Sequence, residues 1–203
     1  MITPFFGSLP EWKDKYVAPD GYTWLFDSNL EGFKKRVWDK LGIVCPIEPN
    51  TGKLWDYRPA LGLLYADEIK DFEFWGHTDF DCVYGDVGKW VTDEFLSNLD
   101  VHSNHNSYVN GCWSLYRNTD EVNNLFRRFP DWKEAMIHPE PNGWVEREYS
   151  RTLEKSGLRY AYTFWQGNPY TQTPNLKKVD NKLYQDGEEI MMFHFRRSKK
   201  YPL

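Results

Sequence analysis

The first half of the chain alternates short apolar runs with helical patterns, and this alternation limits the fold more than any other feature. Strand-like runs occur within GYTWLFDS, where the predicted strand ends at Asp27, at Gly42–Cys45 and at Phe72–Trp75. Between them, Asn29–Leu41 and the segment from Lys53 to Asp67 have the patterns of helices. Strands that alternate with helices predict an α/β fold with a mostly parallel central sheet flanked by helices. Ligands bind such sheets beyond the carboxyl ends of the strands.

The second half of the chain predicts more helices and a C-terminal β-hairpin. Val87–Leu99 and Trp144–Lys155 have helical patterns, and Gly111–Tyr116 has the pattern of a strand. The run NKLYQDGEEIMMFHF holds two strand-like segments around Asp186-Gly187, a dipeptide typical of tight hairpin turns. No repeat, low-complexity tract or long linker marks a boundary. We therefore expect a single domain over residues 1–203.

The composition indicates a folded protein with no general affinity for nucleic acid. Of the 203 residues, 40% are apolar and 18% are aromatic, which argues against disorder. The net charge of −5 gives the chain as a whole no attraction for polyanions. Basic residues do gather locally, at Arg127-Arg128 and between Arg196 and Lys200. Any binding of a polyanion is therefore expected at these places.

The number and spacing of the cysteines, together with the N-terminal sequence, predict a cytoplasmic protein. The three cysteines (Cys45, Cys82 and Cys112) are odd in number and lack metal-ligand or disulfide spacing, so they are interpreted as ordinary thiols in a reducing compartment. The start, MITPFFGSLPEW, has no basic region followed by a long apolar run and does not resemble a signal peptide. No stretch approaches the roughly 20 apolar residues that a membrane span needs.

Two aspartates, Asp79 and Asp81, follow the predicted strand Phe72–Trp75 in the stretch WGHTDFDCVYGD. A solvated turn is the simplest interpretation, but carboxylates at a strand end can also bind a divalent cation. An EF-hand is excluded, because the positions that should hold Asp or Asn, Gly and Glu are occupied by other residues. A phosphatase of the haloacid dehalogenase type remains open, since Asp79 to Val83 satisfies D-x-D-x-[TV]. In that family, however, the motif stands close to the N-terminus, and here it follows three predicted strands.

A nucleotide-sugar glycosyltransferase is the third possibility for this aspartate pair. Such an enzyme must neutralise the diphosphate of its donor, and one divalent cation held by two carboxylates does this. The C-terminal run MMFHFRRSKKYPL adds His194, a possible imidazole ligand, and then basic residues up to Lys200 that could contact phosphates. The alternative is that His194 faces the core and the basic run is solvated.

Taken together, the motifs resemble those of GT-A glycosyltransferases, and within them a poorly characterised family of bacterial and phage proteins. The resemblance covers nearly the whole chain. It implies a single Rossmann-like GT-A domain, with a nucleotide-sugar-binding half over residues 1–85 and an acceptor half with the closing strand over residues 86–203. The motifs that carry it, in order, are PFFGSLP (Pro4–Pro10), WLFDS (Trp24–Ser28), WDYRPALG (Trp55–Gly62), FWGHTDFDCVYGD (Phe74–Asp86), GCWSLYRNTDEV (Gly111–Val122) and FHFRR (Phe193–Arg197).

This resemblance implies a metal site for Mn²⁺ or Mg²⁺. Asp79 and Asp81 would hold the ion against the donor diphosphate, with His194 as the third ligand. The closing His-x₅-Lys pattern of some retaining GT-A enzymes would place Lys200 at the phosphates, and it favours retention of configuration.

The resemblance also assigns residues to the donor and to the acceptor. Asp56 and Arg58 would contact the donor sugar or phosphate, and Arg58 is a catalytic candidate. Phe6-Gly7 and Asp27 would lie beside the nucleoside base. On the acceptor side, Glu146 is the expected acidic residue, with a solvated helix face as the alternative.

The expected activity is transfer of a sugar from a nucleotide diphosphate sugar, with a UDP-sugar as the expected donor, to an acceptor hydroxyl. A glycan precursor is the expected acceptor. The alternatives are a hydroxymethylated base of phage DNA, which the enzyme would have to extract from the base stack, the phosphatase chemistry described above, and a sugar-binding protein without catalytic activity.

Overall fold

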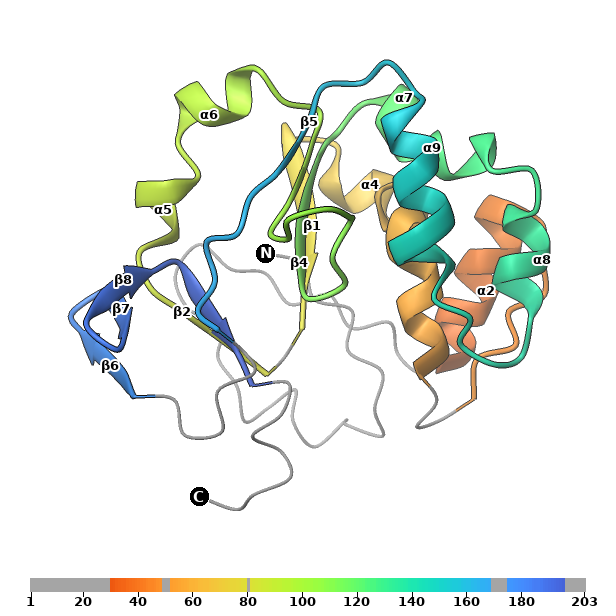
Figure 1. The fold of residues 1–203 in the computed structure, drawn as a ribbon. Coiled ribbons are helices and arrows are strands. Elements are labelled where there is room, and N and C mark those ends of the chain that lie inside the picture. The colour runs from red at the N-terminus through yellow and green to blue at the C-terminus, as the bar shows by residue number, and fades with distance from the viewer. Residues whose placement is uncertain (1–29, 49–51, 80, 169–174, 196–203) are drawn as a thin grey trace. The chain divides into compact units, whose positions relative to one another are not determined.

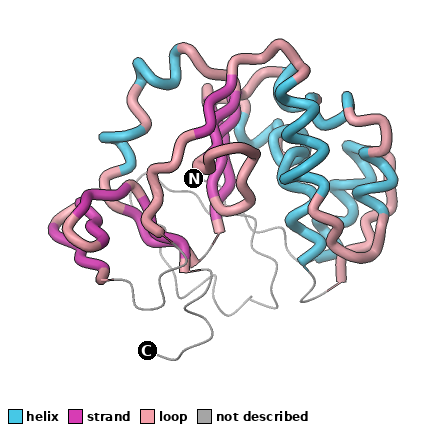
Figure 2. Tube along the Cα trace, in the orientation of Figure 1, coloured by secondary structure: helices cyan, strands magenta, loops and turns pink. Residues whose placement is uncertain are grey.

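The computed structural model describes residues 30–48, 52–79, 81–168 and 175–195. The predictions for Phe6, Gly7, Asp27 and Lys200 lie outside these ranges. The architecture is a mixed α/β fold of helices and several small sheets (Figures 1 and 2). The chain divides into two compact units, one made of residues 1–57 and 131–142 and the other of residues 58–130 and 143–203.

The first unit is built on helix α2 (Leu30–Leu41), which confirms the predicted helix. Its apolar residues Phe33, Val37 and Leu41 recur every four positions and are buried. Helix α2 ends where Gly42 takes a φ of 66°, a conformation that favours glycine. The predicted strand that should start at Gly42 is absent, because residues 42–48 pair with no strand in the part of the chain that is described.

Aromatic and polar contacts join the other described helical segments of this unit to one another and to α2. The 3₁₀ helix η1 (Gly52–Ala60) begins here, and Tyr57 places its ring edge against Phe33, with the ring centroids 5.7 Å apart. The Tyr57 hydroxyl donates a hydrogen bond to the carbonyl oxygen of Met136 in α8 (Trp132–Ile137), at 3.0 Å. This bond ties segments that lie far apart in the sequence.

The second unit contains a four-stranded sheet in the order β1-β4-β3-β5. Its pairings β1–β4 and β4–β3 are antiparallel, and β3–β5 is parallel. The prediction of a mostly parallel sheet is therefore wrong for the described residues. The chain returns from β3 to β4 through a loop, as in a hairpin, where a parallel pair would need a crossover. The strands are Phe74–Thr78 (β1), Val101–Ser103 (β3), Trp113–Arg117 (β4) and Tyr160–Tyr162 (β5).

Two smaller sheets complete the strands of this unit (Figure 1). Strands β2 (Cys82–Tyr84) and β9 (Met192–His194) form an antiparallel pair. Strands β6 (Leu176–Val179), β7 (Lys182–Gln185) and β8 (Glu188–Ile190) form an antiparallel sheet. The turn between β7 and β8 has positive φ at Asp186 and Gly187, of 53° and 90°. The C-terminal hairpin is thus confirmed at the predicted dipeptide.

The helices of the second unit are shorter than the sequence predicts. The predicted helix over residues 87–99 is broken into α5 and α6, because the Thr92 hydroxyl accepts a hydrogen bond from the backbone N–H of Phe95 and starts a new helix. The predicted helix over residues 144–155 is observed as a π-helical turn, η3, followed by α9. The remaining bounds are Leu61–Leu64 (α3), Ala66–Ile69 (α4), Val87–Trp90 (α5), Asp93–Ser97 (α6), Asp120–Asn123 (α7), Leu125–Arg128 (η2), Val145–Tyr149 (η3) and Ser150–Glu154 (α9).

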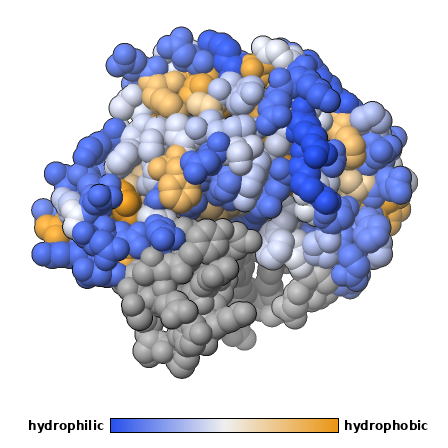
Figure 3. Space-filling view, viewed as in Figure 1, coloured by the Kyte–Doolittle hydropathy of each residue, from blue (hydrophilic) through white to orange (hydrophobic). Residues whose placement is uncertain are grey.

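The core of the second unit includes a ring stack between neighbouring strands. Trp75 of β1 lies on Tyr116 of β4, with ring centroids 4.3 Å apart and planes 15° apart. The Trp75 indole N–H donates to the Asn123 side-chain oxygen at 2.7 Å. The face of the molecule in Figure 3 is mostly hydrophilic, with separate apolar patches between the polar side chains. In the described ranges, no helix has the length and apolar character that a membrane crossing requires.

Candidate functional site

The two aspartates of the D-x-D motif flank the turn between β1 and β2. Strand β1 ends at Thr78, and the backbone N–H of Asp79 then donates to the carbonyl oxygen of Cys112 at 3.1 Å. The carbonyl oxygen of Asp81 accepts from the backbone N–H of Phe195 at 2.9 Å. Both aspartates are therefore anchored through their backbones, one to the segment before β4 and the other to the segment after β9.

Pairing of β2 with β9 brings His194 to the aspartates. The His194 Nε2 atom lies 3.3 Å from Asp81 Oδ2 and 3.7 Å from Asp79 Oδ2. The side chains are 13%, 20% and 25% exposed for His194, Asp81 and Asp79, so solvent reaches all three. The structure thus brings together the three residues that the sequence predicts as metal ligands.

The distances from His194 to the two aspartates are compatible with a shared divalent cation. An octahedral ion with bonds of about 2.1 Å separates neighbouring ligand atoms by about 3.0 Å. The distance from His194 Nε2 to Asp81, 3.3 Å, is close to this separation, whereas the distance to Asp79, 3.7 Å, is about 0.7 Å longer, so Asp79 would have to move slightly to share the ion. Carboxylates suit Mg²⁺ and Mn²⁺ alike, whereas the imidazole of His194 favours the transition metal. Of the two expected ions, the donor set therefore fits Mn²⁺ better.

Arg58 is the cationic neighbour of this cluster. It stands in η1, its side chain is 13% exposed, and its guanidinium forms an ion pair with the Asp79 carboxylate. Gly111 gives the guanidinium room, because a Cβ atom at position 111 would overlap Arg58 Nη1. The same Cβ would lie 3.8 Å from Glu146 Oε1. The side chains of Arg58 and Glu146 therefore both lie next to Gly111. Through its ion pair, Arg58 also contacts Asp79.

Asp56, the other predicted donor contact, has a different environment. Its carboxylate is 3% exposed and pairs with Lys53 Nζ at 2.8 Å, and Lys53 itself has no exposed side-chain surface. The Asp56 Oδ2 atom also accepts from the backbone N–H of Asn142 at 3.2 Å. These contacts all lie within the first unit, where they hold η1 to the segment after α8. They give Asp56 a structural role.

His77 is a site neighbour to which the sequence assigned no function. Its Nε2 lies 3.2 Å from the carbonyl oxygen of Asn110, and its buried Nδ1 has no hydrogen-bond partner in the described ranges. Burial, together with the nearby charge of Arg58, lowers the pKa of His77 to about 3. The ring is therefore neutral near pH 7, and the bond to Asn110 fixes the proton on Nε2. Its position two residues before Asp79 was the signal in the sequence.

A buried polar network holds the loop between β3 and β4. The Asn110 backbone N–H donates to Ser103 Oγ at 2.6 Å, and Ser114 Oγ donates to the Asn110 carbonyl oxygen at 2.9 Å. The Asn110 side-chain oxygen accepts from the backbone N–H of Cys112 at 2.9 Å. Since Gly111 and Cys112 contact Arg58 and Asp79 respectively, this network fixes the backbone that supports the site.

Cys82 also borders the site, although its spacing in the sequence gave no metal signal. One potential ligand atom each from Asp81, Cys82 and His194 lies within 4.8 Å of the other two. Burial, and secondarily the charge of Asp79, raises the pKa of the Cys82 thiol to about 11. Its partly buried side chain packs against an apolar cluster that includes Cys112 and Met192. The signal that could have found it was its position directly after the D-x-D motif.

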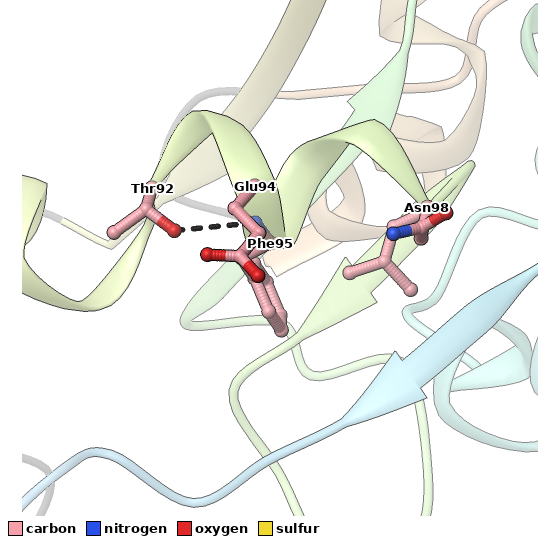
Figure 4. Close-up of a pocket in the computed structure, with 5 residues that line it drawn as sticks. Thr92, Glu94, Phe95 and Asn98 are labelled. Atoms are coloured by element: carbon pink, nitrogen blue, oxygen red, sulfur yellow. Dashed lines mark hydrogen bonds between the residues drawn. The ribbon is translucent and has the colours of Figure 1, made fainter.

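A shallow, open hollow on α6 lies apart from these residues in the chain (Figure 4). Two of its lining residues form the α6 cap, in which the Phe95 backbone N–H donates to Thr92 Oγ1 at 3.1 Å (Figure 4). Its lining includes none of the residues that the sequence predicts for the site. The lining residues are Thr92, Glu94, Phe95, Asn98 and Leu99.

Comparison with known proteins gives a family but no activity. A family profile described as a family of unknown function (DUF6625) matches residues 21–201. No curated protein and no solved structure matches the chain. The matched range includes every residue from Arg58 to His194, and therefore all of the candidate site in the described ranges.

Proposed function

Because the chain belongs to this family of unknown function (DUF6625), its activity must be inferred from its own residues, and we propose that it is a metal-dependent glycosyltransferase. It transfers a sugar from a nucleotide diphosphate sugar, a UDP-sugar in the first instance, to an acceptor hydroxyl of a glycan precursor. The observation that supports this proposal is the meeting of the D-x-D aspartates, Asp79 and Asp81, with His194, which lies far from them in the sequence.

On the donor side, the charged residues of the site would neutralise the diphosphate. Asp79, Asp81 and His194 would hold Mn²⁺, and that ion, when bound, offsets the charge of the leaving diphosphate. Arg58, which already pairs with a carboxylate, has a guanidinium suited to phosphate oxygens and would contact the donor directly. Lys200, outside the described ranges, would add a further positive charge. Charge placed in advance where negative charge develops lowers the barrier to transfer.

On the acceptor side, Glu146 is the proposed acid–base residue. Its side chain is exposed on η3, and its Oε1 would lie 3.8 Å from a Cβ atom at Gly111, next to Arg58. An exposed carboxylate there could interact with the incoming acceptor hydroxyl and accept its proton. His77, which is partly buried, is a poorer base, because its lowered pKa makes it a weak proton acceptor at neutral pH.

The finer fold assignment, a single GT-A domain with its donor half in residues 1–85, belongs to the same proposal. It is supported by the D-x-D motif, which directly follows β1, and by β9, whose last residue, His194, lies beside that motif. The DNA alternative receives less support, because the net charge of −5 gives the chain as a whole no attraction for polyanions.

Release of nucleotide from donors tests the proposed activity. The purified protein is incubated with a panel of nucleotide sugars and Mn²⁺, beside the Asp79→Ala and Asp81→Ala variants. We expect slow, metal-dependent hydrolysis of one donor, lost in both variants. Asp86→Ala is the matched control, since Asp86 is a nearby exposed aspartate whose side chain caps no helix. Turnover that survives in both site variants, or no turnover of any donor, would contradict the transferase and lead to the phosphatase assay.

A further inference from the structure

The residues beside the D-x-D pair form a second, chemically distinct donor set. Potential ligand atoms of Asp81, Cys82 and His194 all lie within 4.8 Å of one another. Cys82 and His194 are directly opposite in the antiparallel pair β2–β9, so their side chains project from the same face. We propose that these three side chains bind a thiophilic divalent cation such as Zn²⁺.

The geometry of the three side chains suits tetrahedral coordination. With bonds of about 2.0–2.1 Å to nitrogen and oxygen, a tetrahedral zinc ion separates these ligands by about 3.4 Å. The distance from Asp81 Oδ2 to His194 Nε2 is 3.3 Å. With a bond of about 2.3 Å to sulfur, the Cys82 Sγ atom should lie about 3.6 Å from each of the other ligand atoms. Because all three ligand atoms lie within 4.8 Å of one another, the observed distances from the sulfur exceed this ideal value by at most about 1.2 Å.

The ligand charges of this donor set match a divalent ion. Asp79 forms an ion pair with Arg58, which offsets its negative charge. The Asp81 carboxylate and the Cys82 thiolate together balance the two positive charges of Zn²⁺. Binding breaks the S–H bond of Cys82, forms the S–Zn bond and releases the proton to the buffer. A water molecule or a substrate oxygen would complete the fourth position.

This zinc site overlaps the proposed donor-metal site, so zinc is an inhibitor. Both sites use His194 Nε2, and an imidazole nitrogen has one lone pair and binds one ion. Zn²⁺ at Asp81, Cys82 and His194 therefore excludes Mn²⁺ from Asp79, Asp81 and His194. The inhibition rests on the proposed transferase activity, whereas the zinc site itself does not.

Cobalt titration tests the zinc site without any enzyme assay. Co²⁺ is added to the metal-free protein, and the near-ultraviolet thiolate-to-cobalt charge-transfer band is recorded. We expect a band in the wild type that Zn²⁺ removes, and no band in Cys82→Ser. Cys112→Ala, which lacks another thiol of the same cluster, and Asp79→Asn should both keep it. No band in the wild type, or a band that persists in Cys82→Ser with an unchanged far-ultraviolet circular dichroism spectrum, would overturn the proposal.

A second measurement separates failure of this proposal from failure of the transferase. Where a donor is turned over, Zn²⁺ should inhibit the wild type, and Cys82→Ser should need at least about tenfold more Zn²⁺ for half-inhibition, because loss of even an outer-shell partner costs tenfold or more in affinity. Equal inhibition of both proteins would overturn the inference. A cysteine-dependent cobalt band without turnover of any donor would support the zinc site and contradict the transferase.

Discussion

Replacement of Lys53 by methionine should destabilise the protein strongly, because it removes the buried cation that pairs with the Asp56 carboxylate. Lys53 Nζ lies 2.8 Å from Asp56 Oδ2, 2.7 Å from the carbonyl oxygen of Ala135 and 3.4 Å from that of Glu140. Removing one partner of a buried ion pair costs about 3–5 kcal/mol. A cost near 4 kcal/mol is a large part of the roughly 5–15 kcal/mol that stabilises a typical domain.

Urea unfolding followed by far-ultraviolet circular dichroism measures this effect. With a denaturant dependence of about 2 kcal/mol per molar, the unfolding midpoint of Lys53→Met should fall by about 2 M. The double variant Lys53→Met with Asp56→Leu should be more stable than Lys53→Met alone, because no uncompensated charge remains buried. A loss below about 1 kcal/mol in Lys53→Met, or a double variant less stable than the single one, would refute the reasoning.

Three further predictions concern a buried histidine, a site glycine and a helix cap. Burial lowers the pKa of His102 from 6.5 to about 4, so the folded state binds fewer protons than the unfolded state between these pH values. The free energy of unfolding should therefore fall by up to about 3 kcal/mol as the pH is lowered from 6.5 to about 4. In His102→Gln this free energy should vary less with pH, and the same pH dependence in the variant and the wild type would contradict the prediction. Gly111→Ala should lower donor turnover about 100-fold by displacing Arg58, whereas Gly88→Ala, whose Cβ meets only Asp86 Oδ1 at 3.6 Å, should not, and steady-state kinetics compare the two. Thr92→Ala should cost about 1 kcal/mol in urea unfolding through loss of the α6 cap, and an unchanged midpoint would exclude that role.

Features set by local chemistry could be predicted from the sequence. Helix α2 could be predicted because Phe33, Val37 and Leu41 are spaced four residues apart, which places them on one face of a helix. The hairpin between β7 and β8 follows from Asp186-Gly187, because few other residues adopt the positive φ values of that turn.

Features set by distant partners could not be predicted. An apolar strand looks the same in the sequence whether its neighbour runs parallel or antiparallel, so the sheet was predicted as mostly parallel, whereas β1 pairs with β4 in the antiparallel direction. The pairing of β2 with β9 brings His194 to the aspartates, and the residue pattern alone had left open whether His194 is a ligand or faces the core. The ion pair between Arg58 and Asp79, and the approach of Cys82, depend on side-chain positions that a residue pattern does not encode.

Titration of UDP into the protein by isothermal calorimetry, with Mn²⁺ and then with a chelator, tests the central claim most directly. The claim is that Asp79, Asp81 and His194 hold a metal ion that binds a nucleotide diphosphate. We expect UDP to bind the wild type only when Mn²⁺ is present, and His194→Ala to weaken that binding while Asp86→Asn leaves it unchanged. Equal binding of UDP with and without Mn²⁺, or equal affinity in His194→Ala and the wild type, would contradict the claim.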